Sequence, residues 1–235
     1  MTNLLALETS SPILSIALQK GKNGKIFASS VGGFSKHAEN LFPTLDRLLK
    51  TAKLSIKDID VWLIGRGPGS FTGLRIGFST LKGFLHLEKK DCFGGLSLDL
   101  IAENVKLAEG ARLAVCLDAY RQKVYARFYQ RRENTWKPES RPSAWTVEEF
   151  ISKLSPGITL TGNAIGRYGK EIQKNPGKIH FLAEKLWYPR ASSLISFFQA
   201  GDKKIEKLEA PKDFIPLYFR LSEAEERMNE HVNAR

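Results

Sequence analysis

The chain has 235 residues, of which 42% are hydrophobic and 26% charged, a balance typical of a folded globular protein and not of a disordered one. No run of about 18 apolar residues is present, and the N-terminus lacks the basic flank of a signal peptide, so we expect a cytoplasmic protein without a membrane span. Lys and Arg number 36 against 25 Asp and Glu, a net charge of +11 that favours contact with polyanions. Cys92 and Cys116 lack the spacing of a metal or redox site, so packed or free thiols are expected.

The first half of the chain predicts alternating strands and helices. The first two strands are joined by the hydroxyl-rich turn Glu8-Thr9-Ser10-Ser11-Pro12. Leucines at helical spacing then predict a helix, and a short buried strand leads into a glycine-rich run. The expected strands cover residues 3–7, 13–18, 25–31 and 61–65 and one beginning near 92, and the expected helices cover 38–52, 72–87 and 97–106.

The second half repeats the order of strand, polar turn and strand. We expect strands over 112–118, 123–130 and 158–162, and helices over 146–154 and 189–200, with Thr146 as an N-cap. The repeated order predicts two related α/β lobes, residues 1–105 and 106–235, each with a mixed sheet flanked by helices. The polar tail after about residue 222 is expected to pack weakly or to fray.

The run GRGPGSFTGLRIG, residues 65–77, has two interpretations. A strand followed by Gly-x-Gly and a helix can present backbone N–H groups to an anion, and the phosphate contacts would then include Gly67, Gly69 and Ser70, with Thr9 and Ser10 from the first turn. The spacing matches neither a Walker loop nor the dinucleotide fingerprint. The alternative is a rigid turn that lets two backbones approach, with Ser70 capping the next helix.

Gly73 and Gly77 lie four residues apart on the predicted helix, with Thr80 next on the same face. Each glycine costs about 1 kcal/mol of helix stability relative to alanine. The compensating gain that we expect is the close approach of another helix or backbone, either within the fold or on another subunit.

Basic and aromatic residues alternate between residues 121 and 141. Such a mixture can bind RNA by charge and stacking, which would make Arg121, Arg127 and Arg131 candidate tRNA contacts. The alternative is a β-hairpin whose aromatic side chains pack inward while its cations face water.

No catalytic constellation is visible in the sequence. The four histidines are scattered without metal-ligand spacing, so no metal site is expected. Glu8 and Asp118 end the first strand of each predicted lobe, where sugar-kinase and actin-like folds place acids linked to Mg²⁺. The turns after these acids lack the glycines that would make room for phosphate, so ATP hydrolysis by this chain alone is not expected.

Five segments together resemble the TsaB family, formerly called YeaZ, of bacterial tRNA threonylcarbamoyladenosine synthesis. They are residues 5–18 (LALETSSPILSIAL), 37–49 (HAENLFPTLDRLL), 65–84 (GRGPGSFTGLRIGFSTLKGF), 117–129 (LDAYRQKVYARFY) and 215–226 (IPLYFRLSEAEE). The resemblance implies two lobes of the actin-like, Hsp70-like ATPase (RNase H-like) superfamily. It also implies a noncatalytic scaffold that activates the paralogue TsaD, which transfers the threonylcarbamoyl group to the tRNA adenosine next to the anticodon, with TsaE as accessory ATPase.

The resemblance also implies where partners bind. TsaD carries a metal-binding His-x-x-x-His, whereas the corresponding residues 94–102 here contain no histidine. The family's helices over about 38–51 and 72–86 form the surface for TsaD and for self-association into a homodimer. No tightly bound cofactor is implied, although ATP or ADP at the subunit junction of the complex is compatible with the family. The interface residues carried over are Leu41, Leu45, Gly73, Ile76, Gly77 and Thr80.

Three functional hypotheses follow. The first is the scaffold subunit, with tRNA bound through the complex. The second is an independent enzyme of the same fold, either an ATPase or a peptidase. The third, compatible with the first, is direct contact between tRNA and the basic hairpin.

Overall fold

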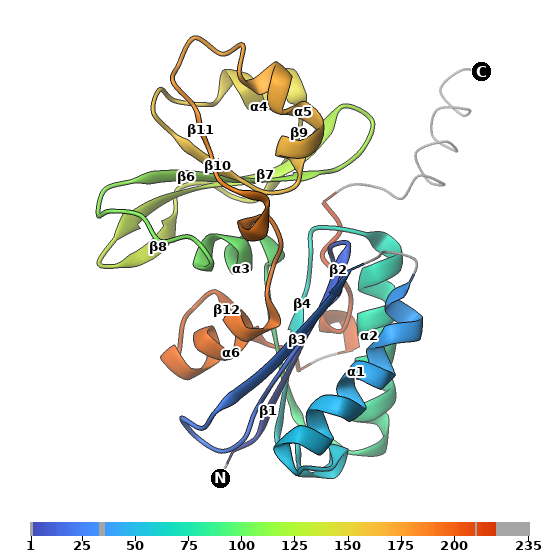
Figure 1. Ribbon diagram of the computed structural model, residues 1–235. Coiled ribbons are helices and arrows are strands. Elements are labelled where there is room, and N and C mark those ends of the chain that lie inside the picture. Colours follow the sequence, from blue (N-terminus) through green and yellow to red (C-terminus); the bar gives the residue numbers. More distant parts are fainter. Residues whose placement is uncertain (1, 33–35, 210, 220–235) are drawn as a thin grey trace, which may run out of the picture.

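The structure is a computed structural model that describes residues 2–32, 36–209 and 211–219, arranged as two α/β lobes stacked one on the other (Figure 1). Each lobe contains one mixed β-sheet with helices on both faces, which confirms the predicted fold class. Within the described residues, no helix is both long and apolar enough to cross a membrane. The predicted behaviour of the tail after residue 222 falls outside the described residues.

The sheet of the N-terminal lobe has the strand order β12-β5-β4-β1-β2-β3. Strands β5, β4 and β1 run parallel, whereas β2, β3 and β12 each pair antiparallel with their neighbour. The bounds are β1 Leu4–Glu8, β2 Ile13–Gln19, β3 Ile26–Gly32, β4 Val61–Gly65, β5 Asp91–Gly95 and β12 Ile205–Lys207.

Alternation along β1 explains the layers of this lobe. Leu5 and Leu7 pack into the cluster formed with α1 (His37–Ala52) and α2 (Phe71–Leu87). Leu4 and Ala6 point to the opposite face, where they meet α6 (Ala191–Ala200). Because all four side chains are buried, β1 is a central strand covered on both faces.

The sheet of the C-terminal lobe has the order β11-β10-β6-β7-β8, and β9 also pairs with β7. Helices α4 and α5 cover one face, and α3 covers the other. The bounds are α3 Ser97–Glu103, β6 Arg112–Asp118, β7 Lys123–Arg132, β8 Thr135–Pro138, β9 Ser143–Thr146, α4 Val147–Ser152, β10 Thr159–Thr161, α5 Ala164–Ile172 and β11 His180–Phe181. Short 3₁₀ turns occur at Ile56–Asp58, Glu184–Leu186 and Pro211–Asp213.

The two lobes exchange helices. Helix α3 follows the N-terminal sheet in sequence but packs on the C-terminal sheet, while α6 follows the C-terminal sheet and packs on the N-terminal one. The two helices also contact each other between the sheets (Figure 1). Strand β12 then joins the edge of β5. The assignment of all residues after 105 to the C-terminal lobe is therefore wrong for residues 191–207, because the second face of β1 and β4 needs the apolar side of α6.

Most predicted elements are present within a few residues of their expected bounds. Thr146 is the N-cap of α4, and its side chain and that of Glu149 form a reciprocal capping box. Both cysteines are buried free thiols, as expected. Burial raises the pKa of the Cys92 thiol to about 12.

Replacement of Leu194 tests the helix exchange. Because Leu194 is buried between α6 and the N-terminal sheet, we expect Leu194→Ala to lower the free energy of unfolding by about 2–5 kcal/mol. Ser196→Ala, on the exposed side of the same helix, is the control and is expected to change stability by less than about 0.5 kcal/mol. Urea denaturation measures both, and equal effects would show that α6 does not cover this sheet.

Candidate functional site

The glycine-rich run forms the junction between β4 and α2, and the turn between β1 and β2 is seated against it. The Ser70 backbone N–H donates to the Ser10 carbonyl oxygen at 2.7 Å, and the Ser70 hydroxyl accepts from the Gly73 N–H at 3.1 Å, which caps α2. Gly67 has φ of +93°, a conformation that glycine adopts without strain. A Cβ at Gly69 would overlap the backbone of Ser10. This loop therefore binds the chain's own turn.

Gly73 and Gly77 face the same turn. A Cβ at Gly73 would overlap the Thr9 carbonyl oxygen, and one at Gly77 would overlap the Thr9 hydroxyl. Both glycines are buried in α2. Their assignment to a partner interface is wrong, because the backbone that approaches them belongs to the same chain. Gly77→Leu would therefore disrupt this internal junction, whether or not a partner binds nearby.

The phosphate interpretation is not supported at this loop. Thr9 and Ser10 are buried, and Ser10 occupies the space beside Gly69 and Ser70 in which a phosphate would have to sit. Gly67 is packed against Leu74 and near the Leu217 backbone. The alternative interpretation, a turn that lets two backbones approach, describes the observed geometry.

Glu8 is wholly buried at the end of β1. Its carboxylate accepts hydrogen bonds from the Ser10 N–H at 2.6 Å and from the Ser97 hydroxyl at 2.9 Å, and the Ser10 hydroxyl donates to that of Ser97 at 2.9 Å. Burial raises the pKa of Glu8, although the bonds from Ser10 and Ser97 act in the opposite direction. The carboxylate joins β1, its turn and the start of α3, and none of it faces solvent.

Asp118, at the end of β6, is likewise engaged by its own lobe. Its carboxylate accepts from the Tyr120 N–H at 2.8 Å and the Tyr168 hydroxyl at 3.3 Å and pairs with Arg167 at 3.2 Å. In the part of the chain that the structure describes, no group of three or more His, Cys, Asp and Glu residues could hold a metal ion.

Two of the three tRNA candidates are internal. The Arg127 guanidinium contacts both oxygens of Asp99 on α3, at 2.8 and 2.9 Å, and donates to the Ser140 carbonyl at 3.0 Å. Arg131 is only 8% exposed and lies over the Trp136 ring. Arg127 and Arg131 are therefore not surface contacts for RNA, because Arg127 is paired with Asp99 and Arg131 is packed over Trp136 within the C-terminal lobe. Arg121 is exposed on the β6–β7 turn.

The outer surface of α1 and α2 contains a groove of about 440 Å³. Leu41 forms part of its floor and is fully buried, and Leu45 lies wholly in the core, so neither presents an accessible interface side chain. Ile76 and Thr80 line the groove and are partly exposed, as the interface prediction requires. The groove is lined by Ala38, Leu41, Phe42, Thr72, Arg75, Ile76, Ser79 and Thr80.

Phe42 is the groove residue that the sequence reasoning missed. Its ring is 56% exposed although it lies in the middle of an ordered helix, and it is in tilted contact with the Phe84 ring, with the centroids 6.3 Å apart. Phe42 falls outside the leucine stripe of α1, and this departure from the helical pattern could have indicated that the ring lies on the surface. An exposed aromatic ring beside a groove is typical of a protein-binding surface.

A double-mutant cycle tests the contact between Thr9 and Gly77. We expect Gly77→Ala to lower the free energy of unfolding, because overpacking costs about 1–3 kcal/mol and exceeds the roughly 1 kcal/mol that alanine gains over glycine in a helix. In a Thr9→Ala background the obstructing hydroxyl is absent, so the same substitution should raise stability by up to about 1 kcal/mol. Urea unfolding of the four proteins measures the cycle, and the same sign in both backgrounds would contradict the contact.

Comparisons with known proteins agree on one family. The family model described as "TsaD: tRNA N6-adenosine threonylcarbamoyltransferase" matches residues 22–227. The tRNA threonylcarbamoyladenosine biosynthesis protein TsaB of Buchnera aphidicola subsp. Schizaphis graminum is 27% identical over 86% of this chain and 95% of its own length. The protein of the same name from Haemophilus influenzae is 30% identical over 73% and 76%.

A solved structure of YeaZ from Pseudomonas aeruginosa superimposes with a TM-score of 0.76 and 26% identity over 93% of this chain and all of the other. The likeness therefore extends over both lobes and the exchanged helices that join them. The chain belongs to the family that the TsaD model describes and, by its relatives and this structural neighbour, to the TsaB (YeaZ) group within it.

Proposed function

We propose that this chain is a noncatalytic subunit in the synthesis of N6-threonylcarbamoyladenosine in tRNA, and that it binds a TsaD-type transferase through the groove between α1 and α2. The names of its relatives support the pathway. The observation that carries the binding proposal is the exposed Phe42 ring beside a groove on α1 and α2, the helices for which the family resemblance implies a partner surface.

The engagement of both acids by groups of the same chain supports a noncatalytic role. In the described residues, Glu8 and Asp118 are engaged by their own hydrogen bonds, and the hydroxyls of Ser10 and Ser97 are bonded within the core. The alternatives of an independent ATPase or peptidase are therefore less favoured, because within the described residues both acids at these turns are already engaged by hydrogen bonds. We propose that TsaE and tRNA bind to the assembled complex and not to this chain alone. We also propose that ATP or ADP binds at the junction between the subunits.

The same groove would serve self-association. In the absence of TsaD, we propose that two copies of this chain pair through α1 and α2, because each copy presents the same groove with the exposed Phe42 ring. TsaD and a second copy would then compete for one surface.

Replacement of Phe42 tests the interface. We expect Phe42→Glu to weaken TsaD binding by at least about 100-fold, because a charge would be desolvated at a central aromatic contact. Leu87→Glu is the matched control: Leu87 is 79% exposed on the same helix pair but lies outside the groove, so its binding should match that of the unchanged protein. Isothermal titration calorimetry with TsaD measures both, and circular dichroism checks folding. Unchanged affinity of Phe42→Glu would overturn the proposed interface.

Reconstitution tests the function itself. With TsaD, TsaE, ATP, tRNA and the threonylcarbamoyl precursors held fixed, product should form with this chain and should fall to background without it or with Phe42→Glu. Thin-layer or mass-spectrometric analysis of the modified nucleoside gives the yield. Equal yields without the chain, or ATP hydrolysis by the chain alone, would contradict a noncatalytic and required subunit.

A further inference from the structure

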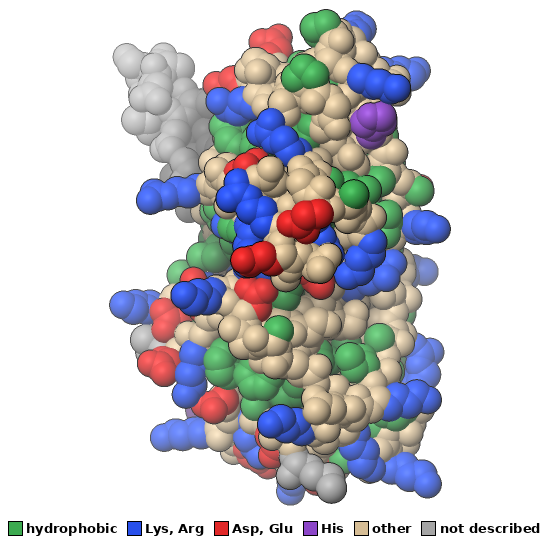
Figure 2. All heavy atoms as spheres, turned by 90° about the vertical axis from the view of Figure 1, so that its left-hand side faces the viewer, with side chains coloured by type: hydrophobic (Ala, Val, Ile, Leu, Met, Phe, Trp, Pro, Cys, Tyr) green, Lys and Arg blue, Asp and Glu red, His purple; other side chains and the backbone are tan. Residues whose placement is uncertain are grey.

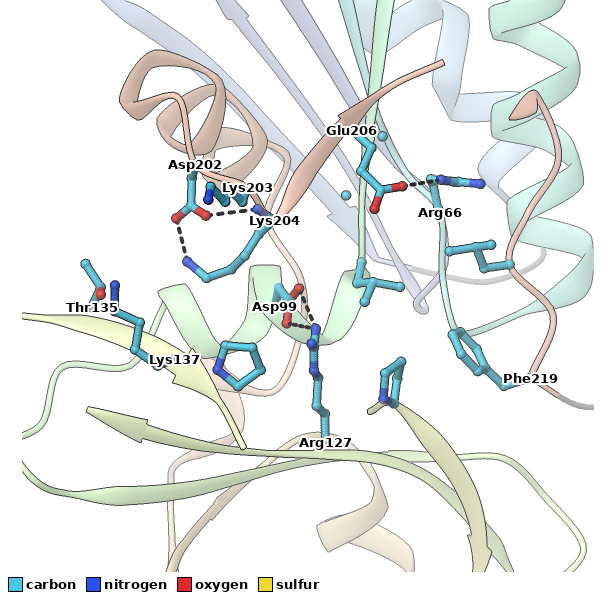
Figure 3. Close-up of a pocket in the computed structure, with 16 residues that line it drawn as sticks. Arg66, Asp99, Arg127, Thr135, Lys137, Asp202, Lys203, Lys204, Glu206 and Phe219 are labelled. Carbon is cyan, nitrogen blue, oxygen red and sulfur yellow. Dashed lines mark hydrogen bonds and ion pairs between the residues drawn. The ribbon is translucent and has the colours of Figure 1, made fainter. Parts of the chain in front are cut away.

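A second cavity, a cleft of about 800 Å³, lies between the lobes and is separate from the α1–α2 groove. One side is formed by Arg66 with β5 and β12, the other by β7 and β8, and α3 lies between them (Figure 3). On the surface, basic and acidic side chains gather at this level between the lobes (Figure 2). The turns that carry Glu8 and Asp118 do not line the cleft.

Arg66 is built into this cleft. Its side chain is 11% exposed and lies on β5, where a Cβ at Gly94 would overlap its methylene groups. Among the residues that the structure describes, the buried Nε–H has no hydrogen-bond partner, although a buried polar group is normally paired. The Arg66 guanidinium pairs with Glu206, at 3.3 Å, whose own side chain is 72% exposed. Because the Glu206 side chain is largely in solvent, this pair contributes little, and the guanidinium retains donors for a further acceptor.

The charges around the cleft leave a positive excess. Five basic side chains face three acidic ones, but Arg127 pairs with buried Asp99, and Lys204 pairs with Asp202 at 2.6 Å. Three cations remain and oppose a single acid, so the lining has an excess of about two positive charges by formal charge at neutral pH. These remaining residues are Arg66, Lys137, Lys203 and Glu206. Lys137 also pairs at 3.3 Å with Glu133, which is largely exposed and lies outside the lining.

The rest of the lining is apolar. Leu217 and Phe219 come from the segment after β12, whose backbone is tied down by a 2.8 Å hydrogen bond from the Leu217 N–H to the Arg66 carbonyl oxygen. Pro138 and Pro142 face them from the C-terminal lobe. A cavity of this volume with apolar walls and a few convergent charges is typical of a small-molecule site.

We propose that this cleft binds a small phosphate-bearing ligand, with Arg66 as its anchor. A guanidinium presents its N–H groups as a planar fork that matches the oxygens of a phosphate. A phosphate monoester carries about 1.5 to 2 negative charges at neutral pH, which matches the positive excess of the cleft. Lys137 would approach from β8 on the opposite side and Lys203 from the turn before β12, and Glu206 would compete with the phosphate for Arg66.

Calorimetric titration of the isolated full chain with pyrophosphate and with ADP tests the proposal. Both probes carry the proposed group, and tighter binding of ADP would assign the apolar walls to an organic moiety, whereas equal binding would assign the site to the phosphates alone. We expect binding of at least one probe and a corresponding rise in melting temperature. If neither probe binds at millimolar concentration, the proposal is overturned.

Two variants with opposite expected effects on ligand affinity distinguish a specific site at Arg66 from general attraction between charges. Arg66→Gln should weaken binding at least tenfold, while Glu206→Gln, at an exposed position, should tighten it several-fold because the competitor for Arg66 is removed. Lys22→Gln, on the exposed β2–β3 turn at the far end of the N-terminal sheet, is the charge-matched control and should leave affinity unchanged. Equal weakening by Lys22→Gln and Arg66→Gln would refute a site at Arg66.

The result is independent of partner binding. Arg66→Gln could also lower the melting temperature of the free protein. In that case Glu206→Gln decides the outcome, because an unchanged ligand affinity of Glu206→Gln would contradict competition for Arg66. Phe42→Glu should retain the ligand, so loss of TsaD binding and loss of ligand binding are distinguishable.

Discussion

The seat of the β1–β2 turn against the glycine-rich run is the contact on which the rest of the molecule depends. Thr9 and Ser10 occupy the space that the missing side chains of Gly69, Gly73 and Gly77 leave open. The contact sets the start of α2, and therefore one wall of the α1–α2 groove. Through the bonds among Glu8, Ser10 and Ser97 it also sets the start of α3, which lines the cleft between the lobes. Both candidate binding surfaces thus rest on one buried junction.

Local patterns predicted the elements well because periodicity and turn chemistry are properties of neighbouring residues. Glycines at positions 73 and 77 show that side chains are absent, but not what arrives there, since Thr9 lies more than sixty residues earlier in the chain. Leu41 and Leu45 belong to the apolar stripe of an amphipathic helix, and that stripe faces the sheet. The residue that departs from the stripe, Phe42, is the one that reaches the surface.

Strand parity would have corrected the view of the basic hairpin. Tyr125, Arg127, Tyr129 and Arg131 are spaced by two and share one face of β7, so the two arginines point the same way as the buried tyrosines. The pairing and burial of these arginines depend on Asp99 and Trp136, which lie on other elements and cannot be predicted from the local sequence pattern. The pairing of β12 with β5 joins segments about 110 residues apart, which is why the domain boundary could not be predicted.

The exchange of α3 and α6 has a consequence for synthesis on the ribosome. One face of the N-terminal sheet is covered by a helix that is translated about 100 residues after β5, and the buried side chains of this face are Leu4, Ala6, Ala17, Val61 and Leu63. At elongation rates of about 5–20 residues per second, that face stays open for roughly 5–20 s. During this interval the nascent lobe presents an apolar sheet face, so a chaperone or the emerging C-terminal lobe must shield it until α6 arrives.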